Sequence, residues 1–212
     1  HLFVFVLVCL VSVVAAADDD LRQGYYRQPA LYGETLVFVS EGDIWKVGDG
    51  GGAAVRLTTH AAAEYGPAIS PDGSTIAFVA GYEGPAALYT MPLAGGRPTR
   101  WTWEGSRIRT VGWTPDGRLI FATDAFSTLP DMQLVELDLE TGDERWRVDF
   151  TERSECGIPA FGFVCSPLGD EDHGYVQAAG SFVKLDKRTG ESVWRTLEDG
   201  GGMNGLIFER RE

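Results

Sequence analysis

The chain has 212 residues, of which 31 are acidic and 18 are basic, so its formal net charge is −13. A surface of this charge repels phosphate backbones and anionic lipid headgroups, which makes nucleic acid and membrane surfaces unsuitable partners. The 27 glycines are scattered between apolar runs, with triplets at 50–52 and 200–202 and a pair at 95–96, and without a three-residue period. Collagen is therefore excluded, and a turn-rich β fold is favoured.

Residues 1–17 read HLFVFVLVCLVSVVAAA, an apolar stretch that ends in three alanines before Asp18. This pattern predicts the apolar region and cleavage site of a secretory signal that lacks its positively charged start. We therefore expect an exported protein, periplasmic or extracellular, with residues 18–27 as the mature N-terminal segment. An uncleaved membrane anchor is the alternative for residues 1–17.

Four segments of the chain share a proline, a polar turn and an apolar strand. The prolines are Pro29, Pro71, Pro115 and Pro167, so successive units start 42, 44 and 52 residues apart. Repeats of roughly 40 to 50 residues are typical of β-propellers, in which each repeat folds as a blade of four antiparallel strands. The sequence therefore predicts an all-β protein, a β-propeller of about four four-stranded blades that is a fragment of a larger propeller.

Within each unit the same strands and turns follow in the same order. Two units carry a Pro-Asp-Gly turn, whose glycine supplies the positive φ of a tight hairpin; its residues are Pro71, Asp72 and Gly73, and Pro115, Asp116 and Gly117. The strand after the turn is expected at 36–39, 76–79, 119–122 and 175–178. The next strand is expected at 43–47, 87–91, 133–137 and 181–185, and the outer strand at 54–57, 98–101, 145–148 and 192–196.

A second motif, Asp-x-x-Thr-Gly-x-x-x-Trp, occurs twice at an offset of 48 residues. Its members are Asp138, Thr141, Gly142 and Trp146, and Asp186, Thr189, Gly190 and Trp194. The aspartate opens a turn by accepting backbone hydrogen bonds, and the glycine supplies a left-handed position. The tryptophan on the following strand is expected to pack between adjacent blades. The motif is therefore interpreted as structural and does not show that a quinone is bound.

The residues also carry two family resemblances. The stretch from Tyr26 to Asp124 contains GDIWKV, RLTTH, AISPDGSTIAFVA and GWTPDGRLIFATD, and it resembles the N-terminal propeller of tricorn-type proteases and TolB-like propellers. The second half, with LDLETGDERW and LDKRTGESVW, resembles the PQQ-like repeat of quinoprotein propellers, although Glu136 and Lys184 stand where that repeat usually has alanine. The resemblances imply tricorn/TolB-like blades at 28–125 and PQQ-like blades at 126–212.

Each resemblance implies a chemistry for which the residues offer no complete site. Tricorn-type proteases carry their serine and histidine in domains beyond the propeller, and His60 and His173 are interpreted as solvated turn histidines. Quinoprotein dehydrogenases hold PQQ near calcium, often against a disulfide of adjacent cysteines, whereas Cys156 and Cys165 are nine positions apart. These cysteines form either a disulfide or two free thiols. No cofactor and no metal are expected, with PQQ and calcium as the alternative.

The leading hypothesis is thus a non-catalytic, exported propeller module that binds a protein, a peptide or a small ligand at its loops. One alternative is a fragment of a PQQ-dependent oxidoreductase. The other is the substrate-gating propeller of a tricorn-type serine protease.

Overall fold

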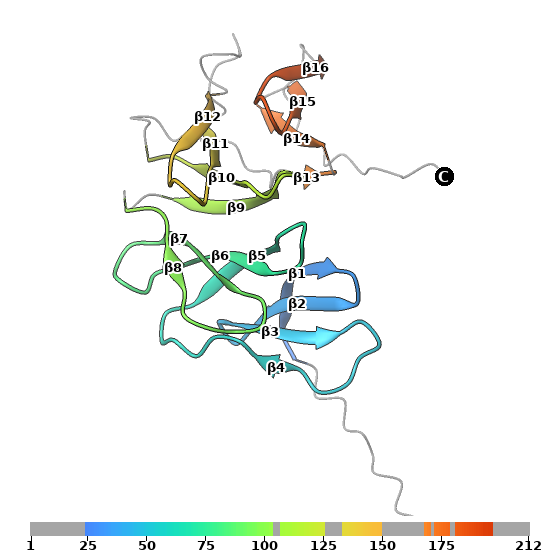
Figure 1. Ribbon diagram of the computed structural model, residues 1–212, viewed down its shortest axis with the longest axis vertical. Helices are drawn as coiled ribbons and strands as arrows, with labels where there is room; N and C mark the ends of the chain where they lie inside the picture. The colour runs from blue at the N-terminus through green and yellow to red at the C-terminus, as the bar shows by residue number, and fades with distance from the viewer. Residues whose placement is uncertain are drawn as a thin grey trace, which may run out of the picture.

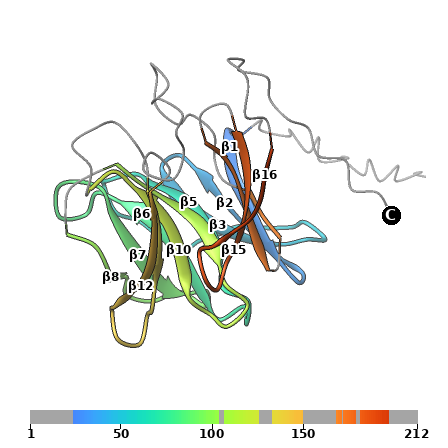
Figure 2. The same ribbon diagram turned by 90° about the horizontal axis from the view of Figure 1, so that it is seen from above.

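The computed structural model describes residues 24–103, 107–125, 133–149, 168–170, 172–178 and 181–196. Their strands form four separate antiparallel sheets of four strands each, as the repeat predicts. Among these residues no helix has the length and apolar character that a bilayer crossing requires. Figures 1 and 2 show the sheets following one another around an arc, with the first and the last sheet on the same side.

Each sheet is one blade, and its strands lie side by side in chain order. Blade 1 contains β1 (Tyr26–Tyr32), β2 (Thr35–Ser40), β3 (Asp43–Gly48) and β4 (Val55–Arg56). Blade 2 contains β5 (Glu64–Ile69), β6 (Thr75–Ala80), β7 (Ala87–Pro92) and β8 (Thr99–Arg100). Blade 3 contains β9 (Ile108–Trp113), β10 (Leu119–Thr123), β11 (Gln133–Leu137) and β12 (Glu144–Asp149). Blade 4 contains β13 (Leu168–Gly169), β14 (His173–Ala178), β15 (Ser181–Asp186) and β16 (Ser192–Thr196).

The first strands of successive blades contact one another, so they form the inner edge of the arc. The sequence analysis placed the other three strands of every blade to within about two residues, but it assigned no inner strand. It also took Pro29 as the equivalent of Pro71, and the strand register corrects this. Ala30 pairs with Val37 as Ala68 pairs with Ala77, so Pro29 corresponds to Pro67 inside the inner strand.

The error has a physical reason, which is a β-bulge that recurs in the inner strands. The register of β1 shifts between Arg27 and Ala30, and Gln28 at the bulge has a φ of 51°. Gly66 is the matching residue of β5, with a φ of 62°. Its N–H donates to Gln28 Oε1 over 2.9 Å, and its carbonyl accepts the hydroxyl of Thr110 on β9. These bonds connect three neighbouring blades at the bulge.

The apolar core lies in the junctions between blades. Strand β6 shows how one strand serves two junctions, because successive side chains point to opposite faces of the sheet. Ile76, Phe78 and Ala80 lie on its leading face, toward blade 1, and Ala77 and Val79 lie on its trailing face, toward blade 3. All five residues are fully buried. Each blade inside the arc is therefore apolar on both faces and depends on its two neighbours.

At the junction of blades 3 and 4, Trp146 lies on the turn around Gly190. A Cβ added at Gly190 would come within 2.8 Å of the indole ring. The Trp146 Nε1–H donates to the carbonyl of Lys187 over 3.3 Å. In return, the buried Lys187 ammonium donates to the carbonyl of Trp113 on blade 3 over 3.1 Å. The tryptophan of one repeat thus packs on the glycine turn of the next.

We predict that Gly190→Ala destabilises the protein more than Gly142→Ala, measured as the free energy of unfolding in urea. Both glycines have a left-handed φ, of 71° and 80°, which costs an alanine about 1–2 kcal/mol. At Gly142 nothing lies within 4 Å of the added Cβ, whereas at Gly190 it meets the Trp146 ring, for a further cost of about 1–3 kcal/mol. Equal losses at the two sites would contradict this packing.

Candidate functional site

The propeller has two ends, and the antiparallel order assigns every connection to one of them. In each blade, the first strand connects to the second and the third to the fourth at one end of the propeller, called here the turn end. The second strand connects to the third, and the fourth strand to the next blade, at the opposite end, called here the loop end. All the motif turns predicted from the sequence lie at the turn end. Residues that present a ligand are therefore expected at the loop end.

The Pro-Asp-Gly motif forms local turns at the turn end. Asp72 Oδ1 accepts from the backbone N–H of Ser74 over 3.0 Å and from the hydroxyl of Ser70 over 2.5 Å. The Ser70 and Ser74 hydrogen bonds lower the pKa of Asp72 to about 2. A side-chain hydrogen bond with Thr114 likewise lowers the pKa of Asp116. Pro71 and Pro115 each lie in the turn between the first two strands of their blade, whereas Pro167 is outside the described residues.

The Asp-x-x-Thr-Gly turns show the same arrangement in blades 3 and 4. Asp138 Oδ1 accepts from the N–H groups of Glu140 and Thr141 over 2.9 and 3.3 Å. Asp186 Oδ1 accepts from those of Arg188 and Thr189 over 2.8 and 3.1 Å. The N–H groups of Gly142 and Gly190 close the turns onto the aspartate carbonyls. These residues act within their own turns and are not brought together into one site.

A buried carboxylate occupies the loop end between blades 1 and 2. Glu64, at the start of β5, is only 1% exposed. Its Oε2 accepts the hydroxyl of Thr58 over 2.9 Å, and its Oε1 accepts the hydroxyl of Tyr82 over 2.7 Å. Burial raises the pKa of Glu64, and the hydrogen bonds from Tyr82 and Thr58 only partly offset the rise. Burial next to this carboxylate also raises the pKa of Tyr82, so its hydroxyl stays a donor.

Asp43 lies beside this carboxylate at the start of β3 and is 3% exposed. Its Oδ2 is paired with the guanidinium of Arg56, while its Oδ1 is buried and accepts no hydrogen bond. The negative charge of Asp43 adds to the rise in the Glu64 pKa. The Arg56 guanidinium also lies 5.9 Å from the ring centroid of Trp45. Two adjacent carboxylates thus lie beneath the loops of this junction.

His60 covers the Glu64 site from the solvent side. Its ring lies 4.4 Å from that of Tyr82, and its Nδ1 accepts the backbone N–H of Ala62 over 3.0 Å. Neither His60 nor His173 is hydrogen-bonded to a serine or a cysteine in the described part of the chain. The sequence analysis found His60 but missed Glu64, because nothing in AAAEYGPA marks that glutamate as buried.

The acidic hairpin around His173 forms a turn at the opposite end of the propeller. Asp170 Oδ1 accepts from the N–H groups of Asp172 and His173 over 3.0 and 2.7 Å, and its Oδ2 accepts the Tyr175 hydroxyl over 2.7 Å. Partial burial raises its pKa, but these hydrogen bonds outweigh it and bring the pKa to about 2. Within the described ranges no three His, Cys, Asp or Glu residues form a possible metal site. Cys156, Cys165 and residues 1–17 lie outside those ranges.

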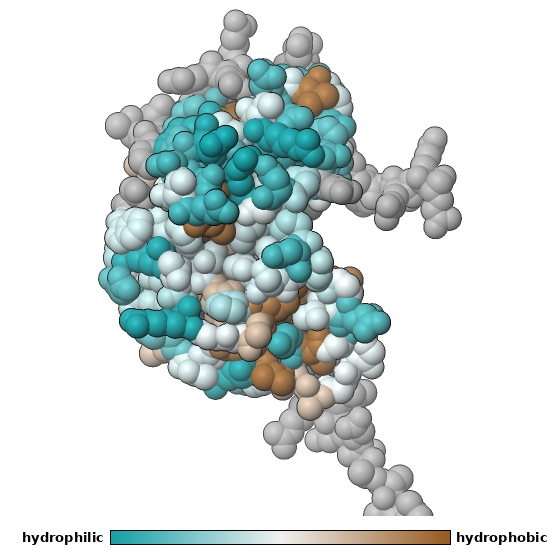
Figure 3. All heavy atoms as spheres, in the orientation of Figure 1, coloured by the Kyte–Doolittle hydropathy of each residue, from teal (hydrophilic) through white to brown (hydrophobic). Residues whose placement is uncertain are grey.

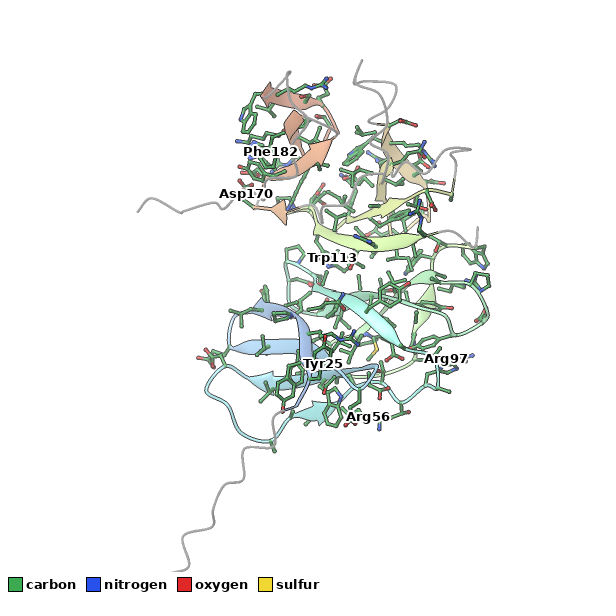
Figure 4. The ribbon with its side chains drawn as sticks, turned by 180° about the vertical axis from the view of Figure 1, so that it is seen from behind. Tyr25, Arg56, Arg97, Trp113, Asp170 and Phe182 are labelled. Carbon is green, nitrogen blue, oxygen red and sulfur yellow. The ribbon has the colours of Figure 1, made fainter. Side chains whose placement is uncertain are left out.

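The leading face of blade 1 carries a groove of about 710 Å³, lined in part by Phe38, Trp45 and Val47. Figure 3 shows hydrophobic atoms gathered over the part of the molecule that holds blades 1 and 2, and Figure 4 labels Tyr25 and Arg56 on blade 1. In strand register, Phe38 and Trp45 correspond to Phe78 and Tyr89 of blade 2, which are buried against blade 1. The groove therefore has the character of a blade junction rather than of a ligand pocket.

Because the pKa of Glu64 is raised in the folded state, its contribution to stability is fully present below the unfolded pKa, near 4.5. That contribution is lost as the pH rises through the folded pKa. We predict that the Glu64→Gln variant becomes more stable relative to the wild type as the pH rises from 4 to 8. The measurement is the difference between their free energies of unfolding, obtained by urea titration. Tyr82→Phe removes a hydrogen bond that lowers this pKa and should move the shift to higher pH. A difference that is constant with pH would contradict the assignment.

Comparison with known proteins supports both resemblances. The profile of the tricorn protease N-terminal β-propeller domain matches residues 23–155, and that of the outer membrane protein assembly factor BamB matches residues 116–210. The matches overlap at residues 116–155, so β10, β11 and β12 of blade 3 match both families, whereas β9 lies in the first match alone. The predicted family resemblances are thereby confirmed, while the division of the chain at residue 125 stays a prediction.

Among curated relatives, tricorn protease homolog 1 of Streptomyces coelicolor is 35% identical over 97 residues, which are 45% of this chain and 9% of that protein. A putative tricorn-like protease N-terminal subunit of Sulfurisphaera tokodaii is 29% identical over 111 residues, 51% of this chain and 57% of that protein. The chain thus spans from about a tenth to somewhat over half of these relatives.

Solved structures show the same fold. The putative TolB of Agrobacterium tumefaciens superposes with a TM-score of 0.62 at 21% identity, over 80% of this chain and 61% of that chain. The β-propeller domain of the trilobed protease from Pyrococcus furiosus gives a TM-score of 0.55 at 16% identity, over 81% of this chain and 57% of that one. The four sheets are therefore blades of a β-propeller, as the repeat predicted.

Proposed function

Because the chain belongs to the family of tricorn protease N-terminal β-propeller domains, we propose that it is a non-catalytic module that binds peptide or protein segments at the loop end of blades 1 and 2. The observation that carries the proposal is the Glu64 site. A carboxylate buried between two hydroxyls holds the loops of two blades together beneath the exposed His60. Because these contacts hold the loops in place, the loop atoms are presented to a ligand in one arrangement.

The charges at this end favour a basic ligand. Glu41 and Glu83 are exposed in neighbouring loops above the buried Asp43 and Glu64. Arg100 pairs with Glu83 over 2.8 Å, and Arg56 pairs with Asp43. Four carboxylates therefore face two guanidiniums, in a chain whose net charge is −13. A lysine side chain or a peptide N-terminus fits this excess of negative charge.

Two further parts of the proposal concern a longer protein that contains these blades, namely a role beside a protease and export from the cytoplasm. The relatives' names support a role beside a tricorn-type protease, where the propeller would select the segments that reach the protease. Export to the periplasm or the extracellular space also stays a prediction, because it rests on residues 1–17. Reading the gene on both sides of this sequence tests both features.

We predict that fluorescein-labelled hexapeptides rich in lysine bind more tightly than glutamate-rich ones, measured by fluorescence anisotropy. The double variant Glu41→Lys/Glu83→Lys should weaken lysine-peptide binding by at least tenfold, because it reverses the charge of the loop end. Glu34→Lys is the matched control, since Glu34 is exposed in the β1–β2 turn at the turn end. The control should change the affinity less than twofold, and the bound peptides should remain uncleaved. Equal losses in both variants, or cleavage by the purified protein, would argue against the proposal.

The PQQ-dependent oxidoreductase hypothesis is favoured only by the second family match, and quinone binding stays a prediction. It is tested by incubating the protein with PQQ and calcium and then removing free cofactor by gel filtration. We expect no quinone absorbance to remain with the protein. A retained, stoichiometric band would favour the oxidoreductase instead.

A further inference from the structure

A pocket of about 360 Å³ lies at the turn end, in the junction between blades 1 and 2. Lys46 and Val55, on β3 and β4, line it from blade 1. Gly73 and Leu93, in the two turns of blade 2 at this end, line it from the other side. Its volume is that of a site for a small ligand.

Lys46 supplies the positive charge of the pocket. Its ammonium donates to the carbonyl of Leu93 over 3.1 Å and forms no ion pair within the described ranges. Asp72 lies in a turn beside the pocket, but its carboxylate is hydrogen-bonded to Ser70 and Ser74. Because an ammonium carries three N–H donors, donors remain for a ligand. The pocket therefore offers a single positive charge in a chain whose net charge is −13.

The strand register identifies the same place in the later junctions. The cross-strand pair of Lys46 and Val55 corresponds to Thr90 and Thr99 in blade 2, and to Glu136 and Trp146 in blade 3. These pairs lie on the trailing face of their blades, because the third-strand residues two positions earlier are buried toward the next blade. Those buried residues are Ile44, Leu88 and Leu134.

In blade 3 an indole ring covers this place. Trp146 packs against the core of the junction, and its Nε1–H donates to the carbonyl of Lys187 on blade 4. Lys187 matches Leu93, since each directly follows the third strand of its blade. The Lys46 ammonium thus makes the hydrogen bond that the indole N–H makes in blade 3, while Val55 stands where blade 3 has the tryptophan.

Blade 2 covers the same place with a different tryptophan. Trp101 packs against the junction with blade 3, and its Nε1–H donates to the hydroxyl of Thr90 over 2.8 Å. Its match in blade 1 is Leu57, which follows β4 as Trp101 follows β8. Blade 1 thus has aliphatic residues at both positions that supply an indole in the later blades, and Val55 is 57% exposed. The pocket therefore lies where the later junctions hold an indole ring.

We propose that this pocket binds a small aromatic carboxylate. The ring lies against the apolar wall of Val55 and Leu93, in the place that an indole side chain takes in the later junctions. The carboxylate accepts a charge-assisted hydrogen bond from the Lys46 ammonium. A monoanion matches this single positive charge, whereas a phosphate group adds further negative charge to an acidic chain. Free aromatic acids and the C-terminal aromatic residues of peptides share this chemistry.

The test measures ligand binding to the full chain at neutral pH by saturation-transfer NMR, which observes the protons of the ligand. The probes are indoleacetate as a free acid, N-acetyltryptophan as a peptide C-terminus, and N-acetyltryptophanamide as their uncharged counterpart. We expect an acid to bind with a Kd of about 1 mM or below, and about fivefold or more tightly than the amide. Binding of indoleacetate alone supports a site for free acids, and binding of N-acetyltryptophan supports a site for peptide C-termini.

Three variants locate the binding in the pocket. Lys46→Met should weaken binding of the acid by about fivefold or more, because it removes the charge and keeps the length of the side chain. Lys184→Met is the matched control at the corresponding position of blade 4, and it should change the affinity less than about twofold. Val55→Trp should abolish binding and raise the melting temperature by about 2–4 °C, because its own indole fills the pocket as Trp146 does in blade 3.

Equal binding of the acids and the amide, or equal losses in the two lysine variants, would overturn the inference. So would the absence of acid binding at millimolar concentrations, or a Val55→Trp variant that binds the acid as the wild type does. The Glu41→Lys/Glu83→Lys variant, which tests the peptide site at the loop end, should change the acid affinity less than about twofold because of the distance between the sites. The two proposals can therefore fail independently.

Discussion

The structure depends on burying sheets that are apolar on both faces. A blade such as β5–β8 has fully buried side chains on each side, among them Phe78 toward blade 1 and Val79 toward blade 3. Each such side chain contributes about 1.5–3 kcal/mol only while a neighbouring blade covers it. The core of the protein is therefore a series of junctions between sheets, and no blade has a core of its own.

The junctions use the same strands but different side-chain sizes. Between blades 1 and 2, the large residues belong to the later blade, as Phe78 and Tyr89 do. Between blades 3 and 4, the largest residue, Trp146, belongs to the earlier blade and meets a glycine turn on the later one. The change occurs in blade 3, where the two family matches overlap. Blade 3 thus joins two packing schemes through a common strand register.

The two ends of the propeller have different tasks. The turn end uses aspartates such as Asp72 and Asp138 to accept backbone hydrogen bonds inside single turns. At the loop end, one side chain links two separate loops, since Glu64 of blade 2 accepts from Thr58 in the preceding connection and from Tyr82 in the following loop. A residue that links separate loops can position them for a ligand, which is why the proposed function rests on this end.

The sequence by itself determined the class of fold, the length of the repeat and three of the four strands of each blade. These follow from local chemistry, because Asp-Gly and Thr-Gly turns and alternating apolar residues act over a few positions. Only the tertiary structure assigned the inner strands, where the bulges at Gln28 and Gly66 interrupt the alternation and where Pro29 was matched to the wrong proline. It alone revealed Glu64 as a buried carboxylate, because its partners Thr58 and Tyr82 come from two different loops and their convergence has no signature in the chain.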